Sequence, residues 1–473
     1  MARRPVAAEA PGTVSFLALM AMVVGSMVGA GVFSLPQRFA QSTGVAGALL
    51  TWGLAGAGMF AIALVFQRLA LRRPDLDTGV YTYARNGFGQ YVGFFAAAGY
   101  WASSCIGNVT YWVLIMSTLG QWFPALGQGS TPLAIGLSSL GLWAFYLLLR
   151  AGAQQAAALN RIVTIAKVIP IVVFLVIAAA ALDPAVFAEN WSGAEHAGPV
   201  FEQLRGTMLV TVFVFLGIEG ASVFSRHARR RRDVGRATVL GFLTVLSIFA
   251  AVTVLSYGVL PVSEIARLQQ PSMAGVLEAV VGPWASVFVG VGLIVAVLGA
   301  YLAWTMMAAE VIYAAAQDGG MPRIFGRQNR RAAPSNALFA STLLAQVVLL
   351  LTVFSDNAFS FALDMTAVMA LFPFLLTSLF ALRLSLGRER EGRRDAVVAL
   401  AATGYTVFLL IAAGFELTLL ASLFYAPATL LFVIARRQQG LKPFTRGELA
   451  LFAVVLAIAL AVVWALATGR MTL

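Results

Sequence analysis

Three carboxylates lie inside long apolar stretches of this 473-residue chain, in which charged residues make up only 11%. They are Glu219, Glu310 and Asp364, whereas the other Asp and Glu residues fall in polar connections or at the ends of apolar stretches. A carboxylate at the centre of a bilayer costs about 2.5 to 3.5 kcal/mol on insertion scales, so each of the three is a functional candidate. Such a group can bind a cation, carry a proton, or accept hydrogen bonds from free backbone N–H groups.

The three carboxylates differ in their surroundings. For Glu219, all three roles remain open, and binding of a cationic substrate side chain is favoured. Asp364 is early in its apolar stretch, so it either lines a cavity or serves at a helix end. Glu310 is close to the end of its stretch and is interpreted as a structural partner for loop arginines.

Two apolar stretches carry glycines where a continuous helix would be disfavoured. The first contains Gly25, Gly29 and Gly31 within seven residues, and a later one contains Gly217 and Gly220 on either side of Glu219. Glycine weakens a helix, and backbone freed at membrane depth persists only beside a cavity or other protein. Close helix packing also explains one glycine-rich stretch. The matched pair instead predicts two interrupted helices framing a substrate site near the midplane.

Other polar and aromatic side chains inside the apolar stretches could take part in binding. Trp304 is in the middle of its stretch, where its ring either holds a cation by cation–π attraction or packs in the core. Asn108 places an amide where it needs a partner. The chain has one cysteine, Cys105, and two histidines in polar connections. The sequence therefore predicts no metal site, no cofactor and no covalent chemistry.

The composition is that of a membrane protein. Hydrophobic residues make up 60% of the chain and the mean hydropathy is +0.86, which excludes soluble enzymes and disordered chains. Runs this long and continuous predict helices, not barrel strands. Thirteen membrane segments are predicted, near 13–37, 44–67, 89–120, 132–149, 156–182, 204–225, 237–260, 284–316, 336–354, 360–382, 396–415, 417–435 and 448–468.

The basic residues predict the orientation in the membrane. If the amino terminus is cytoplasmic, 28 of the 32 Lys and Arg residues fall on the inner side, Lys167 among them, and only Arg38, Arg205, Arg267 and Arg470 fall outside. This asymmetry predicts a cytoplasmic tail at 1–12 and an outer carboxyl end. The pI of about 10.4 is therefore interpreted as a topology signal, and no nucleic-acid partner is expected.

The chain resembles the amino acid/polyamine/organocation superfamily, and within it the basic amino acid/polyamine antiporters. The resemblance is carried by residues 32–36 after the first glycine break and by two motifs at 215–222 and 233–238, which are most similar to the arginine/ornithine branch. It implies an all-α fold with a five-plus-five inverted repeat, the first at 13–182 and the second at 201–384, followed by C-terminal helices at 395–473.

The resemblance also implies roles for individual residues. Trp304 would pack on the cationic side chain, Asn108 and Ser104 would complete its contacts, and Tyr100 and Glu219 would take part in gating or proton coupling. The substrate's carboxylate and amino group would be held by backbone groups of the two breaks, namely Met27, Gly29, Ala30, Gly31, Phe213 and Leu216.

Three departures from the arginine/agmatine antiporter pattern matter. Ala30 replaces a serine, so backbone N–H groups alone would hold the carboxylate. Phe213 replaces a gating tryptophan. Asp364 stands in the place of a serine and would add a negative charge facing the cation, which favours a cationic substrate.

We therefore expect a secondary transporter of cationic amino acids in a prokaryotic inner membrane, exchanging arginine for ornithine or a similar pair by alternating access. A proton-coupled importer of lysine, histidine or a neutral amino acid is the alternative, and a channel is a second one from another class. A monomer and a homodimer both remain open.

Overall fold

The computed structural model describes residues 16–73, 75–76, 79–152, 154–193, 198–219, 231–355, 357–386 and 393–471. The predicted tail at 1–12 and Gly220 lie outside these residues. Every regular element in the described part is helical. The longer helices are α3 (Val45–Arg72), α5 (Gln90–Gly120), α6 (Pro132–Arg150), α7 (Gln154–Ala180), α10 (Val200–Phe215), α12 (Arg231–Ser256), α15 (Trp284–Gln317), α16 (Ser335–Leu351), α17 (Ala358–Leu386), α18 (Arg393–Ala413), α20 (Ser422–Gln438) and α21 (Arg446–Ala467).

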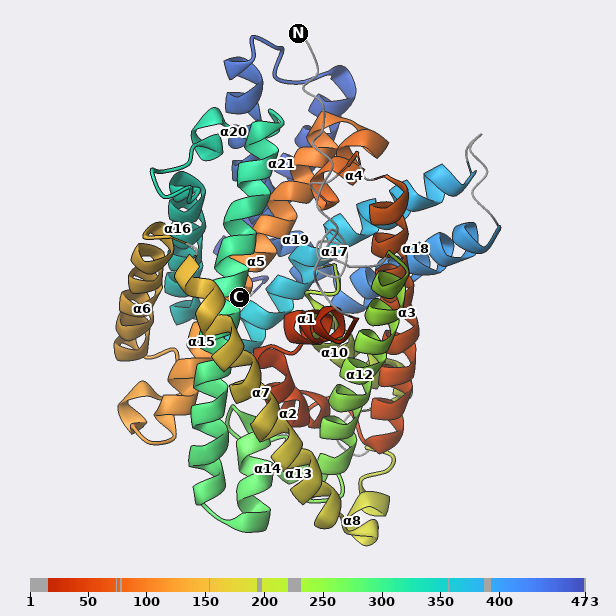
Figure 1. The fold of residues 1–473 in the computed structure, drawn as a ribbon, viewed down its shortest axis with the longest axis vertical. Helices are drawn as coiled ribbons and strands as arrows, with labels where there is room; N and C mark the ends of the chain where they lie inside the picture. Colours follow the sequence, from red (N-terminus) through yellow and green to blue (C-terminus); the bar gives the residue numbers. More distant parts are fainter. Residues whose placement is uncertain are drawn as a thin grey trace.

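Shorter helices lie between these longer helices and connect them (Figure 1). They are α1 (Phe16–Met27), η1 (Ala30–Ser34), α2 (Leu35–Ala40), α4 (Val80–Phe88), η2 (Pro124–Leu126), α8 (Pro184–Glu189), α13 (Val262–Ile265), α14 (Ser272–Val281), η4 (Arg323–Gly326), η5 (Thr352–Phe354) and α19 (Phe415–Leu420).

Within the described residues, 9 helices are long and apolar enough to cross a membrane, which confirms an all-α polytopic membrane protein. The four remaining predicted segments contain α1 with α2, α5, α7 and α10. Two of these are short because the chain leaves the helix near a glycine. A third, α5, carries Ser103, Ser104, Asn108 and Thr110 in its buried middle, and these polar groups lower its hydropathy.

The burial of the helices separates a centre from a periphery. In α17, 72% of the apolar span is buried inside the protein, against 17% in α21. At the centre, α5 packs against both α15 and α17, while α1 packs on α12 and α10 packs on α3. In Figure 1, α1 and α17 lie across the middle of the molecule, and α6 and α16 stand at one side. The interrupted helices α1 and α10 and the polar α5 therefore pack directly on long apolar helices at the centre of the protein.

The last helix is tied to the start of α5. Thr445 and Glu448 form a capping box at the amino end of α21, in which each side chain bonds to the backbone N–H of the other. The second Glu448 carboxylate oxygen accepts a hydrogen bond from the backbone N–H of Tyr91, at 3.2 Å. This N–H belongs to the first turn of α5, where the helix itself supplies no acceptor.

Candidate functional site

The two interruptions predicted from the glycines touch each other. Helix α1 ends at Met27, and Val28 and Gly29 are non-helical before η1 begins. Helix α10 ends at Phe215 and the chain turns through 216–219. The hydroxyl of Ser26 lies 2.8 Å from the carbonyl of Val23 and 3.1 Å from the carbonyl of Gly217. The end of α1 is therefore held directly against the turn that follows α10.

Two glycines are required for this contact. Gly217 has a φ of 103°, which side-chain-bearing residues rarely adopt, and a Cβ there would lie 2.4 Å from the carbonyl oxygen of Ser26. A Cβ on Gly31 would lie 2.5 Å from a methyl group of Val214. The glycines thus let the two broken segments approach backbone to backbone, and this approach leaves polar main-chain groups at membrane depth.

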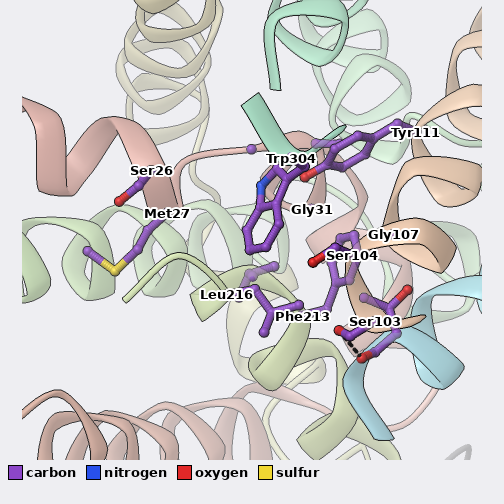
Figure 2. A pocket seen from close by; sticks show the side chains of 14 residues that line it. Ser26, Met27, Gly31, Ser103, Ser104, Gly107, Tyr111, Phe213, Leu216 and Trp304 are labelled. Carbon is purple, nitrogen blue, oxygen red and sulfur yellow. Dashed lines mark hydrogen bonds between the residues drawn. The ribbon is translucent and has the colours of Figure 1, made fainter. Parts of the chain in front are cut away.

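A small cavity lies beside the breaks, with a volume of about 20 Å³, which is room for about one water molecule. A basic amino acid is much larger, so the walls must move apart to admit one. Figure 2 shows Trp304 and Tyr111 on one side of the unwound chain near Gly31, with Phe213 and Leu216 close by. The cavity is lined by Ser26, Met27, Gly29, Ala30, Gly31, Ser103, Ser104, Gly107, Tyr111, Phe213, Val214, Leu216, Trp304 and Thr366.

The structure thus brings eight predicted site residues to one cavity, and they come from α1, η1, α5, α10 and α15. The thioether of Met27 is turned away from the indole of Trp304 in Figure 2, in keeping with a backbone role for Met27. The first N–H groups of η1 have no acceptor within their own helix, and the last carbonyls of α10 have no intrahelical donor. The cavity is therefore lined by residues at a helix start, where N–H groups can donate, and at a helix end, where carbonyls can accept.

One face of α5 supplies residues that the sequence analysis did not single out. Ser103, Gly107 and Tyr111 follow one another at four-residue spacing, so they lie on the same side of the helix as Ser104. The hydroxyl of Ser103 donates to the carbonyl of Thr366 at 2.7 Å. A Cβ on Gly107 would lie 3.3 Å from the Thr366 methyl group. Small residues on α5 therefore draw α17 close to the cavity wall.

Asn108 is buried beside the cavity without lining it. Its amide nitrogen donates to the hydroxyl of Thr305 at 3.0 Å, one residue from Trp304. Its amide oxygen is buried and has no hydrogen-bond partner. An unpaired buried acceptor costs free energy, so this oxygen is a candidate acceptor for a bound ligand.

Two side-chain contacts involve α5 on either side of Ser104. After Ser104, the Tyr111 ring packs edge to face on that of Phe213, with centroids 6.4 Å apart. Before Ser104, the buried hydroxyl of Tyr100 donates to the carboxylate of Glu219. The second Glu219 oxygen accepts from the backbone N–H of Gly217 at 3.2 Å. Tyr100 and Tyr111 are separated by about 16 Å along α5, at 1.5 Å per residue.

None of the three predicted carboxylates lines the central cavity. Glu219 is buried against the turn after α10, where it accepts hydrogen bonds from freed backbone and from Tyr100. Asp364 forms an ion pair with Arg38 at 2.7 Å and lines a different cavity. The α17 residue that lines the central cavity is Thr366. Two residues turn a helix by about 200°, so the two side chains point in opposite directions. Glu310 is exposed.

Lys167 was counted with the cytoplasmic charges, yet it is buried in the described structure, with only 6% of its surface exposed. Its ammonium group donates to the carbonyl of Gly25 at 2.5 Å, in the last turn of α1. The signal was present in the sequence, because Lys167 lies in the middle of the predicted segment at 156–182.

Among the described residues, no group of three or more His, Cys, Asp or Glu side chains could hold a metal ion.

A helical membrane protein in which two broken spans meet at a polar, aromatic-lined cavity has the architecture of a transporter. Residues 14–459 match the model of the amino acid permease family, and the chain belongs to this family. The match confirms the resemblance noted in the sequence and identifies a transporter, not an enzyme. It also places the chain in a membrane.

Three of the similar proteins carry names that concern basic amino acids or agmatine. An arginine/ornithine antiporter of Pseudomonas aeruginosa is 44% identical over 470 residues, covering 96% of this chain and 98% of the relative. An arginine/agmatine antiporter of Chlamydia pneumoniae is 38% identical, covering 96% and 97%. An L-lysine transport protein of Corynebacterium glutamicum is 38% identical, covering 99% and 98%.

Proposed function

We propose that this protein is a secondary transporter that exchanges cationic amino acids, arginine for ornithine or a similar pair, across a prokaryotic inner membrane. The observation that carries the proposal is the contact between the two interrupted helices, where the Ser26 hydroxyl lies 3.1 Å from the Gly217 carbonyl beside a cavity that Trp304 lines. The names of the arginine/ornithine and arginine/agmatine relatives support a basic substrate.

The backbone of the two breaks would bind the part common to all amino acids. N–H groups at Gly29, Ala30 and Gly31 would hold the carboxylate, since a helix start favours an anion. Ala30 has no side-chain oxygen, so this contact depends on backbone donors. Carbonyls at the end of α10, near Phe213 and Leu216, would accept hydrogen bonds from the amino group.

The distal end of the substrate would be bound by side chains. The face of the Trp304 indole can hold a guanidinium or ammonium group, an interaction of about 0.5 to 2 kcal/mol depending on exposure. The unpartnered amide oxygen of Asn108 would accept a hydrogen bond from the same group, and the Ser104 hydroxyl is near enough to the cavity to assist. All three act on a cation without a carboxylate in the cavity wall.

The two side-chain contacts of α5 would act as gates. Phe213 and Tyr111 would separate the cavity from the outer side, while Tyr100 and Glu219 would separate it from the cytoplasm. Opening one pair while the other stays shut is alternating access. Obligatory exchange follows if the loaded carrier reorients readily and the empty carrier does not. Under the same proposal, residues 13–182 and 201–384 form the inverted repeats, and the amino terminus is cytoplasmic. A homodimer remains a prediction.

A second candidate, a proton-coupled importer of lysine or another amino acid, rests on Lys167. The buried Lys167 side chain, bound to the end of α1, can release a proton as an ammonium group and rebind one as a neutral amine, and would thereby couple protonation to α1. The name of the L-lysine relative agrees with this candidate.

The test uses purified protein in liposomes preloaded with ornithine. Uptake of labelled arginine is measured without a pH gradient, with a panel of unlabelled amino acids as competitors. Exchange predicts rapid uptake that needs internal ornithine and is inhibited by basic amino acids. Uptake that does not depend on internal ornithine but requires a pH gradient would favour the importer. Uptake that does not saturate would instead indicate a channel.

A further inference from the structure

A second cavity lies apart from the central one and is larger, with a volume of about 250 Å³. It is bounded by the start of α10, by α17 and by the end of α18, and under the proposed orientation it faces the outer side. Its lining residues are Glu202, Arg205, Gly206, Leu209, Asp364, Ala412 and Ala413. Three of these seven are charged, in a protein whose spans carry few charges.

The charges of this second cavity complement a basic amino acid. Such a substrate carries two positive groups and one negative group, and the walls carry two carboxylates, Glu202 and Asp364, and one guanidinium, Arg205. The closest approach between Glu202 and Arg205 is 3.6 Å, which is loose for an ion pair. Arg205 also donates to the carbonyl of Ala412 at 3.4 Å. The opposite charges therefore remain separate enough to contact different groups of one ligand.

Asp364 is held by a residue that resembles the substrate. One guanidinium nitrogen of Arg38 lies 2.7 Å from its carboxylate, and another donates to the hydroxyl of Ser360 at 2.8 Å. The third nitrogen, Nε, is buried with no hydrogen-bond partner. Arg38 thus reaches Asp364 through a single nitrogen, although guanidinium and carboxylate bind most strongly through two parallel hydrogen bonds.

Arg38 belongs to α2, which continues directly from the break at Gly29 through η1. Its bonds to Asp364 and Ser360 fasten α2 to α17, and each helix is linked to the central cavity, α2 through η1 and α17 through Thr366. The guanidinium of an incoming arginine has the same chemistry as that of Arg38, so the two compete for one carboxylate.

From these contacts we propose that the second cavity is an outer recognition site for cationic amino acids, in which the substrate's cation replaces Arg38 on Asp364 and releases α2 from α17. Glu202 binds the second positive group and Arg205 binds the carboxylate. The release of α2 frees η1, whose residues Ala30 and Gly31 line the central cavity. The substrate class rests on the proposed function, whereas the site itself rests on the geometry of the cavity.

The test measures access to the cavity in the full-length protein. Cys105 is the only cysteine in the chain, so Cys105→Ala provides the background, and Ala413→Cys introduces a thiol into the cavity wall. A small positively charged methanethiosulfonate is added from outside, and its rate of reaction is followed with increasing arginine, ornithine or uncharged citrulline. Phe415→Cys, two residues further along and 86% exposed, is the matched control outside the cavity.

We expect arginine and ornithine to slow the reaction of the thiol at position 413, with no effect of citrulline and no protection of the control thiol. Asp364→Asn and Glu202→Gln should each raise the half-protecting arginine concentration by about tenfold. Arg38→Ala should lower it by about tenfold if Arg38 occupies Asp364 in about nine molecules out of ten. Arg38→Lys, which keeps an ion pair, should behave as the parent protein does.

Four results would contradict the outer site, the competition with Arg38 or the exchange function. Normal arginine/ornithine exchange without protection would overturn the outer site alone. Protection that disappears in Trp304→Ala would overturn it too, because the central cavity would then be responsible. An unchanged or weaker arginine response in Arg38→Ala would overturn the competition. Protection without any exchange would leave the outer site standing and refute the proposed function.

Discussion

The hydrogen bond between Tyr100 and Glu219 allows the sharpest test of the inner gate. Tyr100→Phe removes the only hydroxyl involved and keeps the ring that packs in the core. Glu219→Gln keeps the size of the side chain but leaves one acceptor oxygen for two donors, the Tyr100 hydroxyl and the Gly217 N–H. Either substitution therefore leaves a buried polar group without its partner.

The magnitude follows from the type of bond. A hydrogen bond to a charged group contributes about 1.5 to 3 kcal/mol, and each 1.4 kcal/mol changes an equilibrium about tenfold. If the bond exists only while the inner side is closed, its loss lowers the population of this conformation by roughly 10- to 100-fold. Exchange passes through this conformation in every cycle. Arginine uptake into ornithine-loaded liposomes should therefore slow by a factor approaching that range.

The assay is the initial rate of labelled arginine uptake for both single variants and for the double variant. Because both substitutions break the same bond, the double variant should be less impaired than the product of the two single effects. Tyr91→Phe is the matched control, since that hydroxyl lies on the same helix and pairs with Thr429 at 2.9 Å, away from the cavity. The gate would be refuted if Tyr100→Phe transported as well as Tyr91→Phe, or if the two effects simply multiplied.

Three further substitutions test the breaks, the aromatic wall and the buried lysine. Gly217→Ala should lower the free energy of unfolding by at least about 1 kcal/mol, because the φ of Gly217 is positive and a Cβ there would lie 2.4 Å from the Ser26 carbonyl oxygen. Thermal unfolding measures this change. Gly53→Ala is the control and should change little, because a Cβ at Gly53 meets nothing within 4 Å. Trp304→Ala should raise the KM for arginine by about 2- to 30-fold through loss of 0.5 to 2 kcal/mol of cation–π attraction, and an unchanged KM would remove the indole from the site. Lys167→Met should leave exchange active but make its rate less dependent on pH, as uptake between pH 5 and 9 would show; an identical pH profile would exclude Lys167 as a proton carrier.

The backbone of the site could be predicted from the sequence because it depends on residue type alone. Three glycines in seven residues interrupt a helix wherever the helix lies, and Gly217 adopts a conformation that other residues avoid. The helical class and most span limits follow from hydropathy in the same way. Glu219 and Trp304 could be singled out because a carboxylate and a tryptophan are unusual inside apolar stretches, and the family resemblance then added Tyr100, whose bond to Glu219 no pattern in the sequence predicted.

The direction in which each side chain points was harder to predict. Asp364 and Thr366 are two residues apart, and only packing against α5 decides which of them meets the central cavity. Arg38 is more than 300 residues from Asp364, so no local pattern reveals their ion pair. The buried lysine shows a different difficulty, since a charge near the middle of a span can be counted either with a loop or with the interior. Helical periodicity around Ser104 would have predicted that Ser103, Gly107 and Tyr111 lie on the same side of the helix.

The contact between Glu448 and Tyr91 gives the thirteenth segment, helix α21, a structural role, because it ties this helix to the start of α5. One carboxylate organises the first turn of the final helix and also supplies the acceptor that the first turn of α5 lacks. Shortening the protein ahead of Thr445 would remove that acceptor from the helix that bears Tyr100, Ser104 and Tyr111. Helix α21 thus stabilises the start of α5, which lines the transport pathway, although most of the surface of α21 faces lipid.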